Sequence, residues 1–247
     1  MFADSWEQGR VEVAFTDRLG GVSAPPYTSL NLAAEGGDER SAVAENLSRV
    51  MEAFAGSADA SAALMRQVHG SDVAVVDRDP GPAVAGVEGL PRVDGLVTAL
   101  ADVTLVVRVA DCVPVVVADV ERGVVAALHA GRPGLVAGIV PAGIDALRRL
   151  GAEQLVAWVG PHVCGRCYEV PEPMRADVAE VVPEAWAETS WSTPAVDVGA
   201  GVVAQLHAAG AEVVDASRCT REEQDLFSYR RDGAGAGRMA GLVRVRG

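Results

Sequence analysis

The chain has 247 residues, 49% of them apolar, so it is long enough to bury a full hydrophobic core. Its net charge of −13 argues against non-specific binding to nucleic acid, since that binding depends on neutralising phosphates. All 21 basic residues are arginines, which excludes Schiff-base catalysis and a phosphate-loop lysine.

The sequence contains no segment that predicts membrane insertion or export. No uninterrupted apolar stretch approaches the roughly 20 residues that a membrane-spanning helix needs, and residues 1–7 lack the basic start and apolar run of a secretory signal. We therefore expect a cytoplasmic protein with no membrane partner. We also expect one domain over residues 1–247.

Apolar runs and helical periodicity alternate along the chain and predict a mixed α/β (α+β) fold, with mixed β-sheets flanked by helices. Strands are predicted at 11–16, 64–68, 73–76, 96–98, 103–109, 113–118, 124–128, 155–159, 212–214 and 239–245. Helices are predicted at 41–54, 135–150, 175–182 and 198–209. Residues 184–193 are expected to form an irregular loop.

Cys112 and His129 stand at the two open ends of a predicted β-hairpin with its turn at 119–123. In a hairpin that is symmetric about this turn they face each other, with Cβ atoms roughly 4.5–5.5 Å apart. A thiol and an imidazole at that spacing can bind one metal ion or act as a nucleophile and its base. The hairpin itself needs neither residue.

The other three cysteines give a weaker signal. Cys164 and Cys167 have the C-x-x-C spacing of redox and zinc motifs, but no second such pair completes a tetrahedral site. The alternative is two small apolar residues in a tight turn. Cys219 is expected to be a small buried hydrophobe.

Several motifs, in order along nearly the whole chain, resemble those of the YfiH/YlmD family. Members of this family are also described as laccase-like multicopper polyphenol oxidoreductases and as purine nucleoside phosphorylases. The internal motifs are at 66–70, 110–114, 128–131 and 160–170. The terminal motifs are at 16–23, 29–32, 219–220, 227–231 and 237–239.

This resemblance implies a zinc site built from His69, Cys112 and His129, in a fold shared with the catalytic domain of cytotoxic necrotizing factor. It also implies phosphorolysis of adenosine, inosine, guanosine and methylthioadenosine, and deamination of adenosine. The implied small-molecule partners are a nucleoside and phosphate. Two imidazoles and one thiolate are a suitable ligand set, because three ligands leave a fourth position open for water or substrate.

Asp111, next to Cys112, is a candidate general acid or base beside the catalytic residues Cys112 and His129. In deamination, zinc lowers the pKa of a bound water toward roughly 7, and a carboxylate then has to move the proton. Neighbouring residues on a strand point to opposite faces, however. The alternative for Asp111 is therefore a structural role at a turn.

The substrate-binding candidates follow from the chemistry of phosphate and nucleosides. Arg66, Arg132 and Arg230 are expected to clamp phosphate, because the guanidinium fork matches its oxygens, and Arg18 is a further candidate. The other candidates are Asn31, for a sugar hydroxyl or the base, and Tyr229 and Phe227, which either stack on a purine or belong to the core.

One motif departs from the family pattern. The family usually has an aromatic residue and then Arg after His-Ala-Gly, whereas here Arg132 and Pro133 follow Gly131. The metal ligands are unaffected, but a changed pocket could alter the preferred nucleoside.

Three alternative functions remain open from the residues. The first is a metal-independent cysteine hydrolase that uses Cys112 and His129, which leaves His69 unexplained. The second is a copper-dependent phenol oxidase, but the chain has only four histidines, too few for a multicopper site, so zinc is expected rather than copper. The third is a non-catalytic partner protein that metal stabilises.

Overall fold

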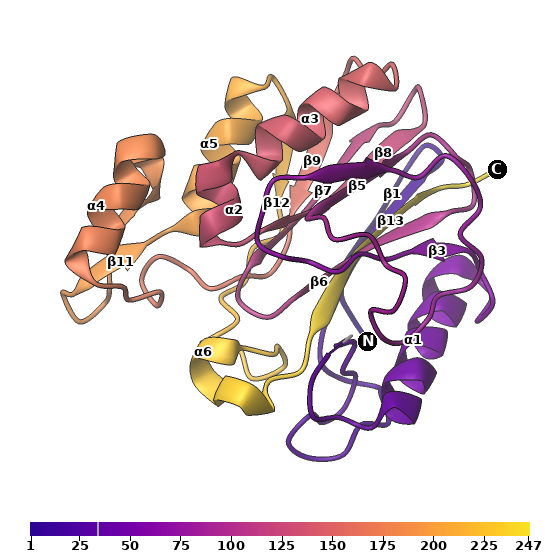
Figure 1. The fold of residues 1–247 in the computed structure, drawn as a ribbon, viewed down its shortest axis with the longest axis horizontal. Helices are drawn as coiled ribbons and strands as arrows, with labels where there is room; N and C mark the ends of the chain where they lie inside the picture. Colours follow the sequence, from indigo (N-terminus) through magenta and orange to yellow (C-terminus); the bar gives the residue numbers. More distant parts are fainter. Residues whose placement is uncertain (34) are drawn as a thin grey trace.

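The computed structural model describes residues 1–33 and 35–247, and two β-sheets form its centre (Figure 1). The five-stranded sheet contains, in spatial order, β1 (Phe2–Gln8), β2 (Val11–Thr16), β13 (Met239–Val245), β6 (Thr104–Val109) and β3 (Ala62–Ala63). The six-stranded sheet contains β12 (Glu212–Asp215), β9 (Val156–Val159), β7 (Val113–Asp119), β8 (Val124–Ala130), β5 (Gly95–Thr98) and β4 (Val73–Val75). A separate two-stranded sheet pairs β10 (Trp186–Glu188) with β11 (Pro194–Val196).

Helices lie outside the two large sheets (Figure 1). The α-helices are α1 (Arg40–Ala55), α2 (Arg132–Ala137), α3 (Ile139–Arg149), α4 (Glu172–Val181), α5 (Val198–Ala208) and α6 (Tyr229–Asp232), with 3-10 turns at Pro183–Ala185 and Gly233–Gly235. Among the described residues, no helix combines the length and apolar character needed to cross a bilayer.

The core explains why the central strands have continuous apolar sequences. Val116 of β7 points into a core between the two large sheets, whereas its neighbours Val115 and Val117 point into a second core under α3 and α5. A third core lies between the five-stranded sheet and α1, where Val50 of the helix is fully buried. The central strands are therefore covered on both faces. The predicted mixed α/β fold, with mixed sheets flanked by helices, is confirmed.

Most predicted elements are present, but the helix predicted at 135–150 is wrong. The structure has two helices there, because Gly138 adopts φ +85° and ends α2 before α3 begins. Glycine tolerates this left-handed conformation without the steric cost of a side chain. The break separates the Gly-rich junction after His129 from the longer helix α3.

The strand predicted at 64–68 is also wrong, since the strand in this region is Ala62–Ala63. The side-chain amide of Gln67 makes the hydrogen bonds to β6 that the backbone of a paired strand would otherwise make. It accepts from the backbone N–H of Arg108 at 2.9 Å and donates to the carbonyl of Arg108 at 2.7 Å. The segment therefore runs beside β6 without forming a regular ladder.

Several further elements were not predicted, among them β1, β10, β11 and α6. The partly exposed edge strand β1 pairs with β2 through the two-residue turn at 9–10. The predicted irregular loop at 184–193 contains the short strand β10, which pairs with β11. These elements are short or half-exposed, and apolar periodicity gives little signal for such elements.

Candidate metal centre and active site

The hairpin that carries Cys112 and His129 exists, but its register differs from the prediction. His129 pairs with Pro114, not with Cys112, and the turn spans 120–123. Cys112 precedes β7 by one residue and lies two positions before Pro114, so its side chain is on the face shared by Pro114 and His129. The two residues are diagonal neighbours, and they still meet.

The structure brings His69 to the same place. One ligand atom from each of His69, Cys112 and His129 lies within 4.8 Å of the others. The His69 Nε2 atom is 3.7 Å from the Cys112 sulfur, and the two imidazole rings meet edge to face with centroids 4.8 Å apart. We call these three residues the triad. His69 is exposed, Cys112 is partly buried and His129 is buried.

Asp94, which the sequence analysis missed, holds two members of the triad. Its fully buried carboxylate accepts from the backbone N–H groups of Val68, His69 and Gly70 at 3.1, 2.9 and 2.7 Å, and so fixes the loop where His69 adopts φ +61°. The same carboxylate lies 2.8 Å from Nδ1 of His129. This contact orients the ring and leaves its Nε2 atom for the triad, as carboxylates do behind metal-binding histidines.

The electrostatics of the triad favour charged side chains. Burial raises the pKa of the Cys112 thiol, but His129 and then His69 outweigh it and lower that pKa to about 6. Burial lowers the pKa of His129, but Cys112 and Asp94 outweigh it and raise that pKa to about 9. For Asp94, burial acts upward, and the hydrogen bonds from His129 and Gly70 turn the net pKa shift downward.

The donor set and the space around it fit a zinc ion. Two imidazoles and one thiolate are zinc ligands, and three protein ligands are typical of open, catalytic zinc sites. Gly131 provides the space: a Cβ at this position would lie 2.6 Å from Cδ2 of His69 and 3.1 Å from the sulfur of Cys112. A side chain there would displace the ligands, so the motif needs glycine.

The triad opens into a cavity of about 780 Å³, within the size range of small-molecule sites. Five arginines line it, so an anion would be attracted to this part of an otherwise acidic protein. The lining includes the predicted Arg66, Arg132, Tyr229 and Arg230, together with Arg108 and Arg238, which were not predicted.

The arginines are held in different ways. Arg66 forms an ion pair with Glu35 at 2.9 Å, and the guanidinium of Arg230 lies 4.5 Å from the ring centroid of Tyr168. Arg108 is 7% exposed and donates to the carbonyl of Met65 at 2.8 Å. Burial lowers the pKa of Arg108 to about 10. A charged side chain that is buried near the end of strand β6 is a feature that periodicity alone does not reveal.

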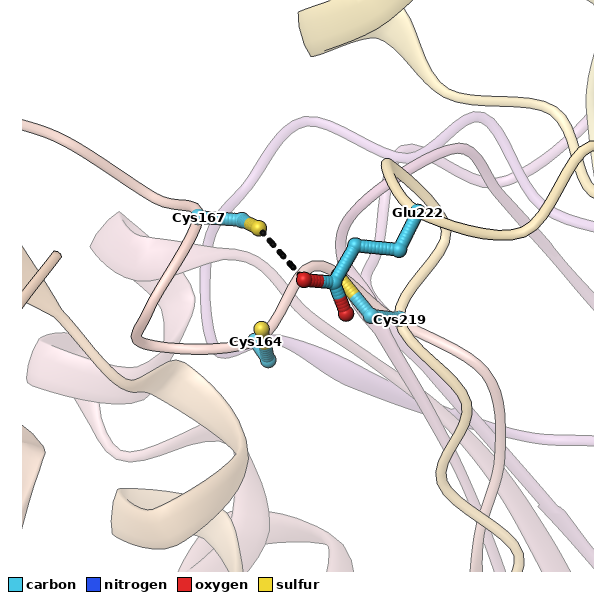
Figure 2. Close-up of side chains that lie close together, drawn as sticks. All are labelled: Cys164, Cys167, Cys219 and Glu222. Carbon is cyan, nitrogen blue, oxygen red and sulfur yellow. Dashed lines mark hydrogen bonds between the residues drawn. The ribbon is translucent and has the colours of Figure 1, made fainter. Parts of the chain in front are cut away.

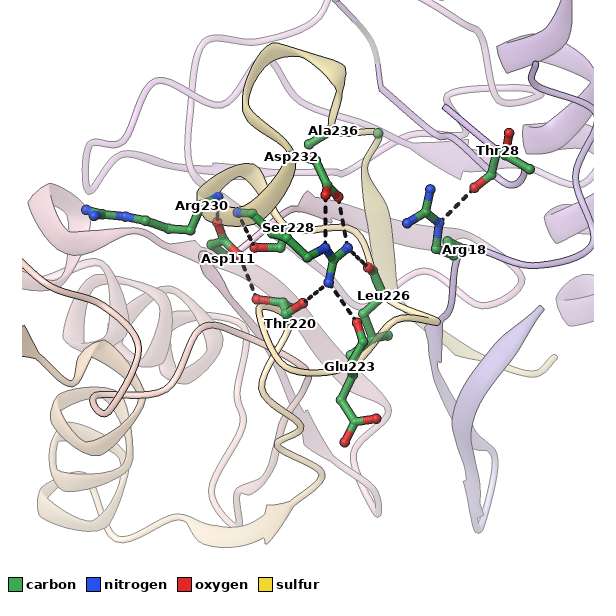
Figure 3. A network of polar contacts seen from close by, with 12 residues as sticks. Arg18, Thr28, Asp111, Thr220, Glu223, Leu226, Ser228, Arg230, Asp232 and Ala236 are labelled. Atoms are coloured by element: carbon green, nitrogen blue, oxygen red, sulfur yellow. Dashed lines mark hydrogen bonds and ion pairs between the residues drawn. The ribbon is translucent and has the colours of Figure 1, made fainter. Parts of the chain in front are cut away.

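Asp111 lines the cavity, but its carboxylate points to the segment that leads into α6 (Figure 3). Its two oxygens accept from the Thr220 hydroxyl and from the backbone N–H of Arg230, both at 2.6 Å. Asp111 has φ +84°, which turns the chain sharply before Cys112. These contacts are those of the alternative role, a carboxylate that caps a turn.

Three other candidates lie apart from the cavity lining. Asn31 is fully buried: its amide donates to Asp38 at 2.8 Å, and its oxygen accepts from the backbone N–H of Arg238 at 2.8 Å. Phe227 is a core residue, with the guanidinium of Arg18 4.5 Å from its ring centroid. Arg18 also donates to the carbonyl of Thr28 (Figure 3). The substrate-binding role of Asn31 stays a prediction.

Residues 12–246 match a family described as multi-copper polyphenol oxidoreductase laccase. A protein of Escherichia coli named purine nucleoside phosphorylase YfiH is 32% identical over 248 residues, 98% of each chain. The chain belongs to the YfiH family. The predicted resemblance is therefore confirmed.

Other members of the YfiH family are also similar along nearly their whole length. A Streptomyces coelicolor protein named purine nucleoside phosphorylase is 54% identical over 232 residues, 93% of each chain. The crystal structure of YlmD from Geobacillus stearothermophilus superposes with a TM-score of 0.86 at 30% identity, covering 96% of this chain and 93% of that one. The fold of this chain is thus that of a YfiH-family protein.

Proposed function

We propose that this chain is a zinc-dependent purine nucleoside phosphorylase. It splits adenosine, inosine, guanosine or methylthioadenosine with phosphate, giving the free purine and the sugar 1-phosphate, and it also deaminates adenosine. The observation that carries the proposal is a triad of zinc-type ligands at the wall of a cavity lined by five arginines. The names of the Streptomyces coelicolor and Escherichia coli relatives support the phosphorylase activity.

The arginines hold the attacking anion. In phosphorolysis a phosphate oxygen bonds to C1′ of the sugar, while the electrons of the breaking glycosidic bond go to the purine, which takes up a proton. The forked guanidinium groups of Arg66, Arg132 and Arg230 match the phosphate oxygens and can bind them in pairs. Tyr229, which is 55% exposed, offers an aromatic face to the purine.

The triad and its support supply the other half of the site. A zinc ion held by His69, Cys112 and His129 would supply a Lewis acid with an open coordination position. Asp94 keeps His129 oriented and holds the loop of His69, so the three ligands are in place before substrate arrives. We assign Asp111 as a positioning residue that fixes the start of α6, and with it Arg230 and Tyr229, at the cavity wall.

A second candidate function has one observation in its favour. Cys112, His129 and Asp94 follow one another as a thiol, an imidazole and a buried carboxylate, the order of a nucleophile, its base and an orienting acid. Such a cysteine hydrolase would need no metal. It leaves the position of His69, 3.7 Å from the sulfur, without a purpose.

The two functions differ in their need for His69. We would assay the purified protein with adenosine, with and without phosphate, beside His69→Ala and the control His207→Ala, which changes an exposed histidine on α5. For the parent we expect phosphate-dependent release of adenine and phosphate-independent formation of inosine. His69→Ala should lose both activities and one zinc ion per chain, whereas His207→Ala should lose neither.

Full activity of His69→Ala in either reaction would overturn the zinc mechanism. Inactivity of the parent on every nucleoside, with zinc bound at the triad, would favour the non-catalytic alternative. Loss of activity only after alkylation of Cys112, with no metal in the parent, would favour the hydrolase.

A further inference from the structure

A second group of metal-type ligands lies outside the cavity lining. Cys164, Cys167, Cys219 and Glu222 each place one sulfur or oxygen atom within 4.8 Å of the others (Figure 2). We call these four residues the thiol cluster. The cysteines are free thiols in the structure, and Cys167 is 5% exposed. Nothing in the proposed phosphorylase reaction uses them.

The cluster is built from two matching turns. The backbone N–H of Cys167 donates to the carbonyl of Cys164 at 2.9 Å, and the N–H of Glu222 donates to the carbonyl of Cys219 at 3.1 Å. Each turn therefore presents its first and fourth side chains to the same point. The sequence analysis found no second half-site, because this half is C-x-x-E instead of C-x-x-C and lies 55 residues further on.

The fold brings the two turns together. His162 and Cys219 form an isolated parallel bridge, in which the N–H of Thr220 donates to the carbonyl of His162 at 3.0 Å. Across the cluster, the sulfur of Cys167 lies 3.6 Å from an oxygen of Glu222 (Figure 2). Ligand atoms contributed in pairs by two such turns are the usual construction of a structural zinc site.

We propose that the thiol cluster binds a structural Zn²⁺ ion through the three cysteine sulfurs and the carboxylate of Glu222. Tetrahedral zinc with bonds of about 2.3 Å places sulfurs about 3.8 Å apart, so the observed spread of the cluster needs only a small contraction. Binding releases the three thiol protons. All four coordination positions are then filled by protein, which makes the site closed and non-catalytic.

The surrounding charges agree with this assignment. Three thiolates and a carboxylate around Zn²⁺ carry a net negative charge, and the guanidinium of Arg166 lies 4.0 Å from Glu222 to offset part of it.

A metal here would tie together two parts of the cavity wall. Next to the first turn, the N–H of Val163 donates to the carbonyl of Asp111 at 3.0 Å, and Val163 and Tyr168 line the cavity. Next to the second turn, the hydroxyl of Thr220 donates to the carboxylate of Asp111. The ion would hold both segments against Asp111. The inference does not rest on the proposed reaction, because it concerns ligands that the reaction does not use.

The test counts zinc per chain in the full-length protein, purified with reductant and without added metal, and in two variants. We expect about two zinc ions in the parent, one in Cys112→Ala and one in Cys167→Ser. Cys167→Ser is also combined with Cys112→Ala. If Cys167→Ser lowers the zinc count neither in the parent nor in Cys112→Ala, the proposal is overturned, whatever the enzyme assay shows. A count of one in the parent, retained in Cys167→Ser, would also overturn it.

A spectroscopic measurement covers the case in which Cys167→Ser does not fold. Cobalt substituted into the parent gives sulfur-to-cobalt charge-transfer absorption that grows with the number of thiolate ligands. Since three of the four cysteines are in the cluster, Cys112→Ala should keep about three quarters of the parent signal. Loss of the whole signal in Cys112→Ala, or a cystine found by thiol titration of the denatured protein, would contradict the site.

Discussion

The triad and the thiol cluster differ in the number of their ligand atoms and in what surrounds them. The triad has three donors and faces a cavity, while the buried Asp94 holds His129 and the loop of His69 in place. The thiol cluster has four donors on two hydrogen-bonded turns and does not line that cavity. An open set of three ligands suits chemistry on a bound molecule, and a closed set of four suits structural support. Asp111 connects the two groups, because it precedes Cys112 in sequence and is hydrogen-bonded to Val163 and Thr220, the chain neighbours of Cys164 and Cys219.

Gly131→Ala should have the largest effect and should act on the triad alone. The added Cβ would lie 2.6 Å from the ring of His69, so His69 or Cys112 must move, and we expect loss of triad zinc and of nucleoside turnover. Zinc analysis and activity assays check this, with zinc at the thiol cluster unchanged.

Gly70→Ala is the matched control, since a Cβ there meets its nearest atom at 3.5 Å, an ordinary contact distance. Equal zinc loss in the two variants would show that the close approach at Gly131 is not what the site needs.

Asp94→Asn should weaken zinc binding at the triad by about 10- to 100-fold, because an amide orients the His129 ring less strongly than a carboxylate. Competition with a chelator measures this affinity. The thiol cluster provides an internal reference, since Asp94 does not contact it. A parallel loss at both sites would mean that the variant damages the whole fold and would remove the contrast between them.

Arg66→Ala should raise the KM for phosphate by about 10-fold, as expected for a lost charged hydrogen bond, with a smaller change in the KM for the nucleoside. Steady-state kinetics with each substrate varied in turn measures both. Arg40→Ala is the control, because Arg40 is exposed and pairs with Glu88 on the surface. A rise confined to the nucleoside KM would move Arg66 from the phosphate to the nucleoside part of the site.

Asp111→Asn should have the smallest effect, a fall in kcat of about 3- to 10-fold, since asparagine tolerates the positive φ and keeps one hydrogen-bond acceptor. The shape of the pH profile should stay unchanged. Loss of one limb of the profile, with a fall above about 100-fold, would restore Asp111 as the general acid or base.

The sequence predicted those parts of the fold that depend on local patterning. Strands buried on both faces appear as apolar runs, so 103–109, 113–118 and 239–245 were found with nearly correct ends. The break at Gly138 was missed, because an isolated glycine within a helical pattern does not show whether its φ is positive. The pairing of Cys112 with His129 was placed two residues out of register, since the conformation of the turn at 120–123 sets the register and is not visible in the flanking strands.

The sequence by itself predicted that Cys112 and His129 meet, because they stand at the open ends of one hairpin, and the resemblance to the YfiH/YlmD family added His69 to them. Only the tertiary structure decided which carboxylates support or complete the two metal-type sites. In the sequence, Asp94 and Glu222 are ordinary acidic residues. Asp94 has its role because it is buried behind His129. Glu222 has its role because its turn packs against the turn of Cys167, which lies 55 residues earlier in the chain. A hydrogen bond or a coordination site depends on distances of a few ångströms, and the folding of distant segments against one another sets those distances.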